Sequence, residues 1–392
     1  MVSLMGTWIQ NLAMGWLVYR MTDSAFYLGL VGFAGQIPAL VLTPIAGVYA
    51  DRLNRRSVLI VTQAVPMILA LTISILIFTD TVTVNLLLLI VFINGLATAF
   101  DTPFRHAFLV EMLGDKKLLQ NAVALNSTLF NSARFIGPTI GGFMIAFMGE
   151  AFCFLFNGVS YLGVIIALMS MRLPKHETHK LKGSILSNLK EGIAYTYNFV
   201  PIRFLIMLVM TSSLFGLPFQ AFLPVFARDI LQGDSQTLGL LVGAVGAGAL
   251  TGAFYLASRR HIRGIPAMIS ITALLFAISL MAFSLSSITW LSLVLLYLTG
   301  FGMIVQFAST NTLLQTVVAE DKRGRVMSLY GLSFMGITPL GSLLLGALAA
   351  SFGVPLTLLI SAAVCLLAAL LFLKKVKLVK EMLGTNPEHN PA

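Results

Sequence analysis

The stretch "GVYADRLNRRSVL", residues 47–59, places four charged side chains between two long apolar runs: Asp51, Arg52, Arg55 and Arg56. Charge is scarce elsewhere, since only 10% of the 392 residues are charged and 58% are hydrophobic. A soluble domain contains about 25% charged residues. The composition therefore excludes an ordinary soluble protein and predicts an integral membrane protein.

The apolar residues come in blocks of about 20, separated by short polar joints. A helix of about 20 residues crosses the roughly 30 Å hydrocarbon core of a bilayer, whereas the strands of a membrane barrel are about ten residues long and alternate in polarity. We therefore expect an all-α membrane protein with twelve transmembrane helices, at residues 1–19, 26–49, 57–78, 85–104, 121–147, 151–171, 204–226, 237–258, 265–286, 288–310, 326–351 and 354–373.

The basic residues are distributed very unevenly around these spans. Of the 25 lysines and arginines, 22 lie in the joints on one side, Arg20 and Arg228 lie on the other, and Arg134 lies inside a span. Lysine and arginine accumulate on the cytoplasmic side of membrane proteins, so both termini are expected in the cytoplasm. The net charge of +10 then reflects topology, and no nucleic-acid partner is expected. No basic residue precedes the first span, which argues against a signal peptide and favours a natural start upstream of Met1.

The chain divides into two sets of six spans. The joint "EMLGDKKLLQNAVALNS" (111–127) matches "VVAEDKRGRVMSLYGLS" (317–333) at a shift of 206 residues. Same-orientation repeats of six helices surround the pathway of many secondary transporters. We expect a first half, a cytoplasmic linker, a second half and a cytoplasmic tail, at 1–171, 172–203, 204–373 and 374–392.

The linker carries a weak periodic signal. Ile185, Leu189 and Ile193 recur every four residues, which predicts a short amphipathic helix on the inner membrane surface. His176 and His179 lie in the same linker without further candidate ligands, so no metal site is expected there.

The opening stretch resembles the signature between spans 2 and 3 of the major facilitator superfamily of secondary transporters, with five residues in the expected places: Gly47, Asp51, Arg52, Arg55 and Arg56. The signature more often has a glycine where Asn54 stands. More narrowly, "GTWIQNLAMGWLVYRMT" (6–22) and "DTPFRHAFLVEML" (101–113) are similar to a bacterial exporter branch that includes multidrug and enterobactin (siderophore) exporters.

The charges of this stretch have two interpretations. Gly47 and Asp51 are four residues apart on one helix face, so the glycine permits close backbone approach while the carboxylate reaches the positive N-terminus of a neighbouring helix. The resemblance implies that this neighbour is span 11 and that the three arginines help to hold the inner gate shut. Alternatively, the arginines only obey the positive-inside rule. Asp51 favours the gate, because an acid contributes little to topology.

Span 5 contains "ARFIGPTIGG" (133–142), in which four residues resemble the antiporter motif of superfamily exporters: Gly137, Pro138, Gly141 and Gly142. Ala133 departs from the usual glycine at the start of the motif. The proline removes one backbone hydrogen bond and the glycines allow close packing, a combination that bends a helix. The resemblance implies export, and ordinary packing of small residues is the alternative.

Arg134 and Asp101 are the only basic and the only acidic residue inside predicted spans. Placing either at the bilayer centre costs about 2.5 to 3.5 kcal/mol, so we expect them to face a wet cavity. We interpret Asp101, with Arg105 and Arg134, as the proton-coupling group, because a partly desolvated carboxylate beside an arginine titrates as its surroundings change. The alternative is a structural ion pair of Asp101 with one of these arginines.

Uncharged polar side chains inside the spans are candidate substrate contacts. Helix–helix hydrogen bonds explain each of them equally well. An adaptable apolar pocket would suit the 28 phenylalanines and 18 methionines, although lipid-facing packing also explains both. The candidates are Gln10, Asn11, Gln36, Asn94, Asn131, Gln306 and Asn311.

Together these features predict a proton-coupled exporter of amphipathic, drug-like compounds that works by alternating access. We expect it in the bacterial cytoplasmic (inner) membrane, as a monomer whose partners are a small-molecule substrate, protons and the lipid bilayer. A siderophore is the alternative substrate, and an uptake symporter of the same fold is the alternative direction.

An enzyme is the rival class, and the sequence argues against it. All five histidines fall in or beside cytoplasmic joints, far from any set of acids or nucleophiles at membrane depth. No G-x-x-x-x-G-K-[ST] phosphate loop occurs, so energy must come from an ion gradient or from the substrate. We expect no catalytic residue, no cofactor and no metal.

Overall fold

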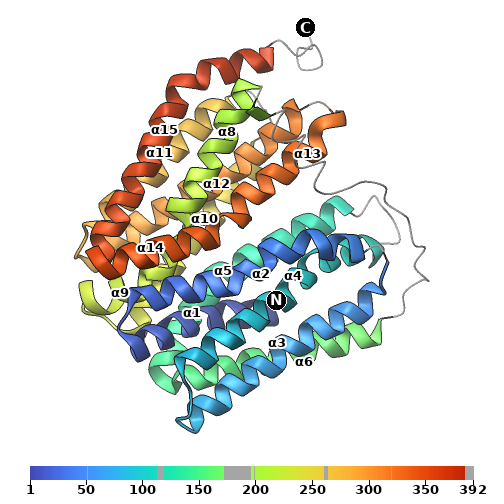
Figure 1. Ribbon diagram of the computed structural model, residues 1–392, viewed down its shortest axis with the longest axis vertical. Coiled ribbons are helices and arrows are strands. Elements are labelled where there is room, and N and C mark those ends of the chain that lie inside the picture. Colours follow the sequence, from blue (N-terminus) through green and yellow to red (C-terminus); the bar gives the residue numbers. More distant parts are fainter. Residues whose placement is uncertain are drawn as a thin grey trace. The chain divides into compact units, whose positions relative to one another are not determined.

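The structure, a computed structural model, describes residues 1–50, 52–112, 119–171, 196–197, 199–259, 264–318 and 320–384. Every regular element within these ranges is a helix (Figure 1). The expected all-α fold is therefore confirmed. Asp51 and the amphipathic helix expected in the linker lie outside the described residues.

The chain forms two compact units, and unit 1 comprises Met1–Lys182 together with Ala221–Gly243. The second segment contributes α9 (Leu223–Val225), a π-helical turn at Phe226–Ile230 and the beginning of α10 (Ser235–Ala257). The first segment contributes α1 (Val2–Thr22), α2 (Ala25–Tyr49), α3 (Arg55–Phe78), α4 (Val84–Met112), α5 (Leu119–Met148) and α6 (Glu150–Ser170).

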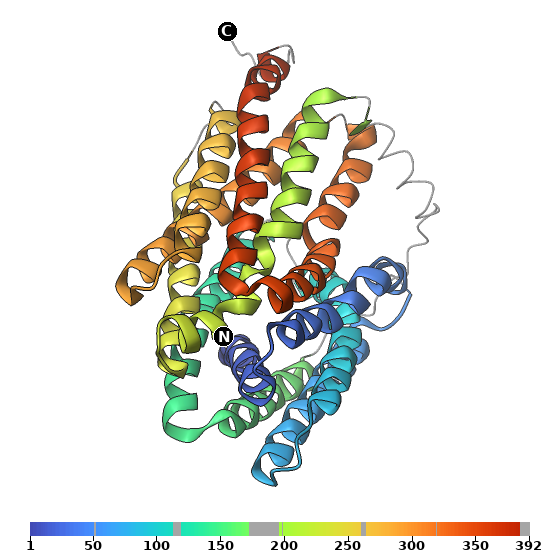
Figure 2. The ribbon, with the colours of Figure 1, turned by 60° about the vertical axis from the view of Figure 1, so that its left-hand side comes forward.

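Unit 2 comprises Gly183–Gln220 and Ala244–Ala392. In it α15 lies beside both α8 and α11, and Figure 2 shows the red α15 next to the green α8. Its helices are α8 (Val200–Thr211), the rest of α10, α11 (Ile265–Ser284), α12 (Thr289–Val317), α13 (Glu320–Gly331), α14 (Thr338–Phe352) and α15 (Val354–Gly384).

The two units do not coincide with the two halves expected from the sequence. Ala221–Gly243 belongs to the second half of the sequence and lies in unit 1. Compact units are defined by proximity and not by internal repetition, so the division into two six-span repeats stays a prediction.

Ten stretches of the described residues are long and apolar enough to cross a membrane. The expected spans 1 and 5 correspond to α1 and α5, which have 21 and 30 residues but carry several polar side chains and are not among these ten. With α1 and α5 included, the helices are compatible with twelve crossings. The ten are Ala25–Gly47, Arg55–Phe78, Val84–Leu109, Glu150–Ser170, Val200–Ile230, Ser235–Ala257, Ile265–Ser284, Thr289–Val317, Lys322–Phe352 and Val354–Lys377.

Two of the spans are not continuous α-helices. Val200–Ile230 passes from α8 through a π-helical turn at Ser212–Gly216 and a 3₁₀ segment at Leu217–Phe222 before reaching α9. Pro218 lies in this interrupted region and has no N–H to continue an α-helical ladder. Another π-helical turn, Leu332–Gly336, likewise precedes Pro339 near the start of α14. Hydropathy alone does not reveal such local changes of backbone geometry.

Glycines allow close contacts between helices of unit 1. In the α2–α4 pair, a Cβ built on Gly95 would lie 2.5 Å from the backbone oxygen of Gly35. In the α3–α6 pair, a Cβ on Gly158 would lie 2.7 Å from the side chain of Leu71. Only a residue without a side chain allows the first of these approaches, because the atom it meets is backbone.

We expect G95A to destabilise the protein by about 1–3 kcal/mol, because α4 must move away from α2 to admit the methyl group. The measurement is thermal unfolding of the purified protein in detergent. G163A is the matched control: a Cβ on Gly163 of α6 meets nothing within 4 Å among the described residues. That control should be neutral or slightly stabilising, because alanine favours a helix. Equal melting temperatures for the two variants would contradict the close α2–α4 contact.

Candidate functional site

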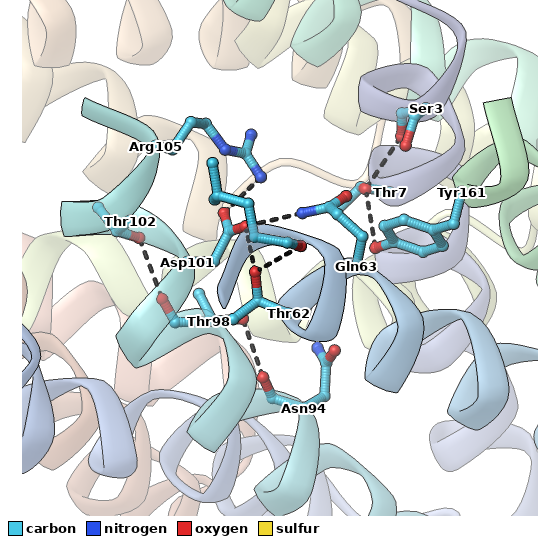
Figure 3. A network of polar contacts seen from close by, with 11 residues as sticks. Ser3, Thr7, Thr62, Gln63, Asn94, Thr98, Asp101, Thr102, Arg105 and Tyr161 are labelled. Atoms are coloured by element: carbon cyan, nitrogen blue, oxygen red, sulfur yellow. Dashed lines mark hydrogen bonds and ion pairs between the residues drawn. The ribbon is translucent and has the colours of Figure 1, made fainter. Parts of the chain in front are cut away.

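Asp101 on α4 is the centre of a polar network that joins α4 to α3 (Figure 3). The residue is buried, with a relative exposure of 8%. Gln63 donates a hydrogen bond from Nε2 to Oδ1 at 2.7 Å, and Thr62 donates from Oγ1 to the same oxygen at 3.0 Å. Arg105, one turn further along α4, binds Oδ2 through Nη2. One cation and two neutral donors from two helices therefore hold this carboxylate.

Local packing explains why α3 presents these donors to α4. Leu59 on α3 packs in one apolar cluster with Phe104 and Phe108 of α4 and Leu168 of α6. Because the cluster fixes α3 against α4 close to the network, Gln63 and its neighbour Thr62 face Asp101. The sequence analysis missed both donors; the only signal was a pair of adjacent polar residues in a mainly apolar span.

Of the two arginines considered as partners of Asp101, the structure brings Arg105 to it. Arg134 lies on α5, and its guanidinium carbon is 5.5 Å from the ring centroid of Trp8 on α1. This distance is within the range of a cation–π interaction. No contact with Asp101 therefore supports a role for Arg134 in proton coupling. The contact of Arg134 with Trp8 instead joins α5 to α1.

The beginning of α3 is held by contacts to the joint before it, to α4 and to α6. Arg55 donates from Nε to the Ala50 oxygen at 3.0 Å, and its Nη1 lies 3.2 Å from Oε2 of Glu111 at the end of α4. Arg56 donates from Nη2 to the Met169 oxygen at the end of α6. Sequence reasoning missed Glu111, which lies near the end of α4 and beyond the span predicted at 85–104.

Three further residues of the stretch 47–59 have different environments. Asn54 caps α3, since its Oδ1 accepts a hydrogen bond from the Ser57 N–H at 3.0 Å, which explains an asparagine at a position where glycine is more common. Arg52 is exposed. A Cβ built on Gly47 meets nothing within 4 Å among the described residues, and the close backbone approach to span 11 stays a prediction.

The glycine motif of α5 packs against two helices of unit 1. A Cβ on Gly137 would lie 2.8 Å from Cβ of Trp8, and one on Gly141 would lie 3.3 Å from Cα of Ile9, both on α1. A Cβ on Gly142 would lie 2.8 Å from Cα of Gly239 on α10.

The close approach of α5 to α10 requires a glycine on each helix. A Cβ on Gly239 would in turn lie 2.9 Å from Cα of Gly142 and 2.9 Å from the backbone oxygen of Pro138. Ser235 donates from Oγ to the Gly142 oxygen at 3.1 Å. The motif thus provides the close packing expected of its small residues, while its role as an antiporter motif stays a prediction.

The candidate substrate contacts fall into distinct groups. Gln10 on α1 accepts a hydrogen bond at 2.7 Å from Nδ2 of Asn157, which is fully buried on α6. In unit 2, Gln306 on α12 is buried and donates to Oγ of Ser212 at 2.8 Å. Asn311 accepts a bond at 3.0 Å from Gln315 of its own helix. Gln10 and Gln306 therefore serve as helix–helix contacts in this structure.

The other four candidates have different exposures. Asn11 and Gln36 are exposed, whereas Asn94 and Asn131 are partly buried. Asn94 appears in Figure 3 one turn from Thr98, whose Oγ1 donates to the Asn94 backbone oxygen at 2.9 Å. Their roles as substrate contacts stay predictions.

Residues 1–390 match the protein family described as transmembrane secretion effector, which is a branch of the major facilitator superfamily. The chain belongs to this family. Its architecture agrees, because a bacterial homologue of the human lysosomal transporter Spinster has a TM-score of 0.75 to it at 12% identity, covering 100% of this chain and 96% of that one. Such low identity shows the fold alone, and the fold is that of the major facilitator superfamily.

Two curated relatives are similar along nearly their whole length. The Staphyloferrin A transporter of Staphylococcus aureus is 25% identical over 383 residues, which cover 96% of this chain and 95% of that protein. The multidrug efflux pump Tap of Mycolicibacterium fortuitum is 29% identical over 367 residues, which cover 90% and 88%. As a member of the transmembrane secretion effector family, the chain is a multi-pass membrane transporter of small molecules and not an enzyme.

We expect Q10L to lower the free energy of unfolding by about 1 kcal/mol, because it leaves the buried amide of Asn157 without its partner. The double variant Q10L/N157L should recover part of this loss, since removing both polar groups is less costly than removing one. Thermal unfolding in detergent measures both. If Q10L unfolds like the wild type, the hydrogen bond is not structural and Gln10 returns to the substrate candidates.

Proposed function

We propose that this transporter exports amphipathic small molecules in exchange for protons, as a monomer in the bacterial cytoplasmic membrane with both termini in the cytoplasm. Proton coupling is assigned to Asp101 because its carboxylate is buried on α4. Its hydrogen-bond partners, such as Gln63, can interact with either the ionised or the protonated carboxyl group. The Tap relative, named a multidrug efflux pump, supports a drug-like cargo and outward direction. The glycine motif of α5 supports the same direction.

The partners of Asp101 suit a group that alternates between two charge states. An ionised carboxylate only accepts hydrogen bonds, and the observed arrangement offers it three donors: Gln63, Thr62 and Arg105. A protonated carboxyl must also donate one. The amide of Gln63 can meet this need by turning its own oxygen toward Asp101, since an amide carries both a donor and an acceptor.

Protonation also changes the contact between helices. A neutral Asp101 loses its ion pair with Arg105, and this frees the guanidinium, which is about half exposed. The bonds from Thr62 and Gln63 weaken as well, because a neutral carboxyl is a poorer acceptor. Since these bonds join α3 to α4, the proton state of Asp101 biases how the two helices pack, and a change that favours one conformation of the helices shifts the population of the transporter toward it.

A siderophore is the second candidate cargo. The relative named Staphyloferrin A transporter aligns with almost the entire chain and favours this alternative. Uptake by symport is the alternative direction, and a transport assay in inverted membrane vesicles separates the two. An exporter accumulates a fluorescent substrate in such vesicles when a proton gradient is applied, whereas a symporter accumulates it in right-side-out vesicles.

We expect D101N to abolish substrate accumulation driven by a proton gradient in inverted vesicles, because the amide cannot bind and release a proton. Substrate exchange at equal pH on both sides should persist, which shows that the protein is inserted and binds its cargo. Gradient-driven accumulation at the wild-type rate would remove Asp101 from the coupling role.

We expect Q63L to reduce the maximal rate of gradient-driven transport by about threefold to tenfold, with an unchanged KM for the substrate. The reason is that Asp101 keeps its charge but loses the donor that orients it. T98V is the matched control, since Thr98 is an exposed residue of α4 whose hydroxyl bonds only its own helix among the described contacts. A change in KM alone, or equal losses in both variants, would contradict the positioning role of Gln63.

A further inference from the structure

Arg134 lies near the middle of α5 (Leu119–Met148), about 20 Å from either end of the helix. A charged side chain at the centre of a membrane costs about 2.5 to 3.5 kcal/mol on insertion scales. Charged residues at this depth almost always face the interior of the protein or a water-filled cavity, and they pair with a group of opposite charge or with backbone oxygens. A partner for the guanidinium of Arg134 is therefore expected.

The part of the chain that the structure describes provides no such partner. Arg134 forms no ion pair and no side-chain hydrogen bond with any described residue. Each acid on the described parts of α1 to α6 is bound to a different arginine. These pairs are Asp101–Arg105, Glu111–Arg55 and Glu150–Arg20. The positive charge of Arg134 is therefore not balanced by these helices.

Two aromatic side chains lie beside this guanidinium. Its carbon is 5.5 Å from the ring centroid of Trp8 on α1. Phe130, one turn before Arg134 on α5, meets the same indole edge to face, with the ring centroids 5.9 Å apart. Gly137 allows α1 to come this near, since a Cβ there would lie 2.8 Å from Cβ of Trp8. We call Arg134, Trp8 and Phe130 together the Arg134 site.

The Arg134 site is accessible from the surface of unit 1. Arg134 and Trp8 are partly buried, whereas Phe130 is 45% exposed. The side-chain nitrogens of Arg134 are not among the polar atoms that are sealed from solvent without a partner. Asn11, one turn after Trp8 on α1, is exposed. Because an arginine facing lipid would bear the cost of hydrocarbon, we interpret the open side of the site as part of the aqueous transport pathway.

We propose that Arg134 binds the anionic group of the transported molecule, so that the cargo is an amphipathic organic anion whose apolar part lies against Trp8 and Phe130. The proposal rests on the proposed function and narrows its substrate class. The contact with Trp8 engages no acceptor oxygen, so the N–H donors of the guanidinium stay available. Two of them match the two oxygens of a carboxylate, which is the pairing that a guanidinium favours.

An anionic lipid headgroup is another source of such a group, and the depth of Arg134 argues against it. Headgroups lie about 15 Å or more from the bilayer centre, outside the hydrocarbon core. Arg134 lies near the middle of its helix. A free amphipathic anion that enters the pathway reaches this depth without bringing a headgroup into the membrane.

The test measures equilibrium binding to the full-length protein in dodecyl maltoside micelles, without a gradient. Trp8 is the reporter, because replacing Trp16 and Trp290 by phenylalanine leaves it as the only tryptophan. The probes are phenylalkanoates of increasing chain length, each matched with the amide of the same skeleton. At neutral pH the acid is ionised, and the amide has nearly the same shape without the charge. We expect the best-binding acid to bind about tenfold or more tightly than its amide.

R134Q should remove this preference, because glutamine keeps a polar side chain without the charge. R134K keeps the charge but loses the forked donors, so it should retain part of the preference. R20Q is the matched control: it removes the same charge from the end of α1 and should keep the wild-type preference. Acid and amide are compared in the same preparation, so the fraction of folded protein cancels from their ratio.

Three results would overturn the proposal: equal affinities of acids and amides in the wild type, binding by no acid of the series, or an R134Q variant that keeps the wild-type preference. Phosphatidylglycerol added to the micelles should displace the acid no more than phosphatidylcholine does. Specific displacement that depends on Arg134 would assign the site to a lipid headgroup and also overturn it.

The best-binding acid should also accumulate in the inverted-vesicle assay. If it binds through Arg134 but does not accumulate, the proposed export function fails while the anion site stands. If a different cargo accumulates but no acid binds, the export function stands and the anion site fails. The two proposals are therefore decided by separate measurements.

Discussion

A charged or polar side chain inside hydrocarbon needs partners, and this constraint positions the buried Asp101 and Asn157 of unit 1. Asp101 has donors from both α3 and α4, and the buried amide of Asn157 has Gln10 on another helix. Partners on different helices tie the state of a side chain to the packing of the backbone. A carboxylate bound in this way can couple its charge to a movement, whereas an amide pair of constant charge can only hold two helices together.

The fold could be predicted because the bilayer imposes a length on every span. The stretch expected at 26–49, for example, is α2, Ala25–Tyr49. The interruptions of the seventh and eleventh spans were not predicted, because they depend on how the backbone accommodates Pro218 and Pro339. Mean hydropathy is the same for a regular helix and for one with a π-helical turn, so apolar block length contains no information about these changes.

The candidate site could be predicted only where its residues share a helix. Asp101 and Arg105 are four residues apart on α4, and this spacing alone brings them together. Contacts between different helices depend on the register of one helix against the other. For this reason Gln63 was missed as a partner of Asp101, and Arg134 was considered as one. Packing of apolar side chains such as Leu59 and Phe104 sets that register, and no periodicity within a single helix records it.

The contacts at the two ends of unit 1 join different segments of the chain. At one end, the interactions of Arg55 and Arg56 connect helices of the first half. At the other, the contact of Gly142 with Gly239 and the pairing of Asp23 with Arg228 connect the first half to Ala221–Gly243. Apolar packing adds to these contacts, because Leu223, Val225 and Phe226 of the same segment are buried and α9 packs against α1. Separating Ala221–Gly243 from the first half would therefore expose apolar surface, which costs about 25 cal/mol per Å².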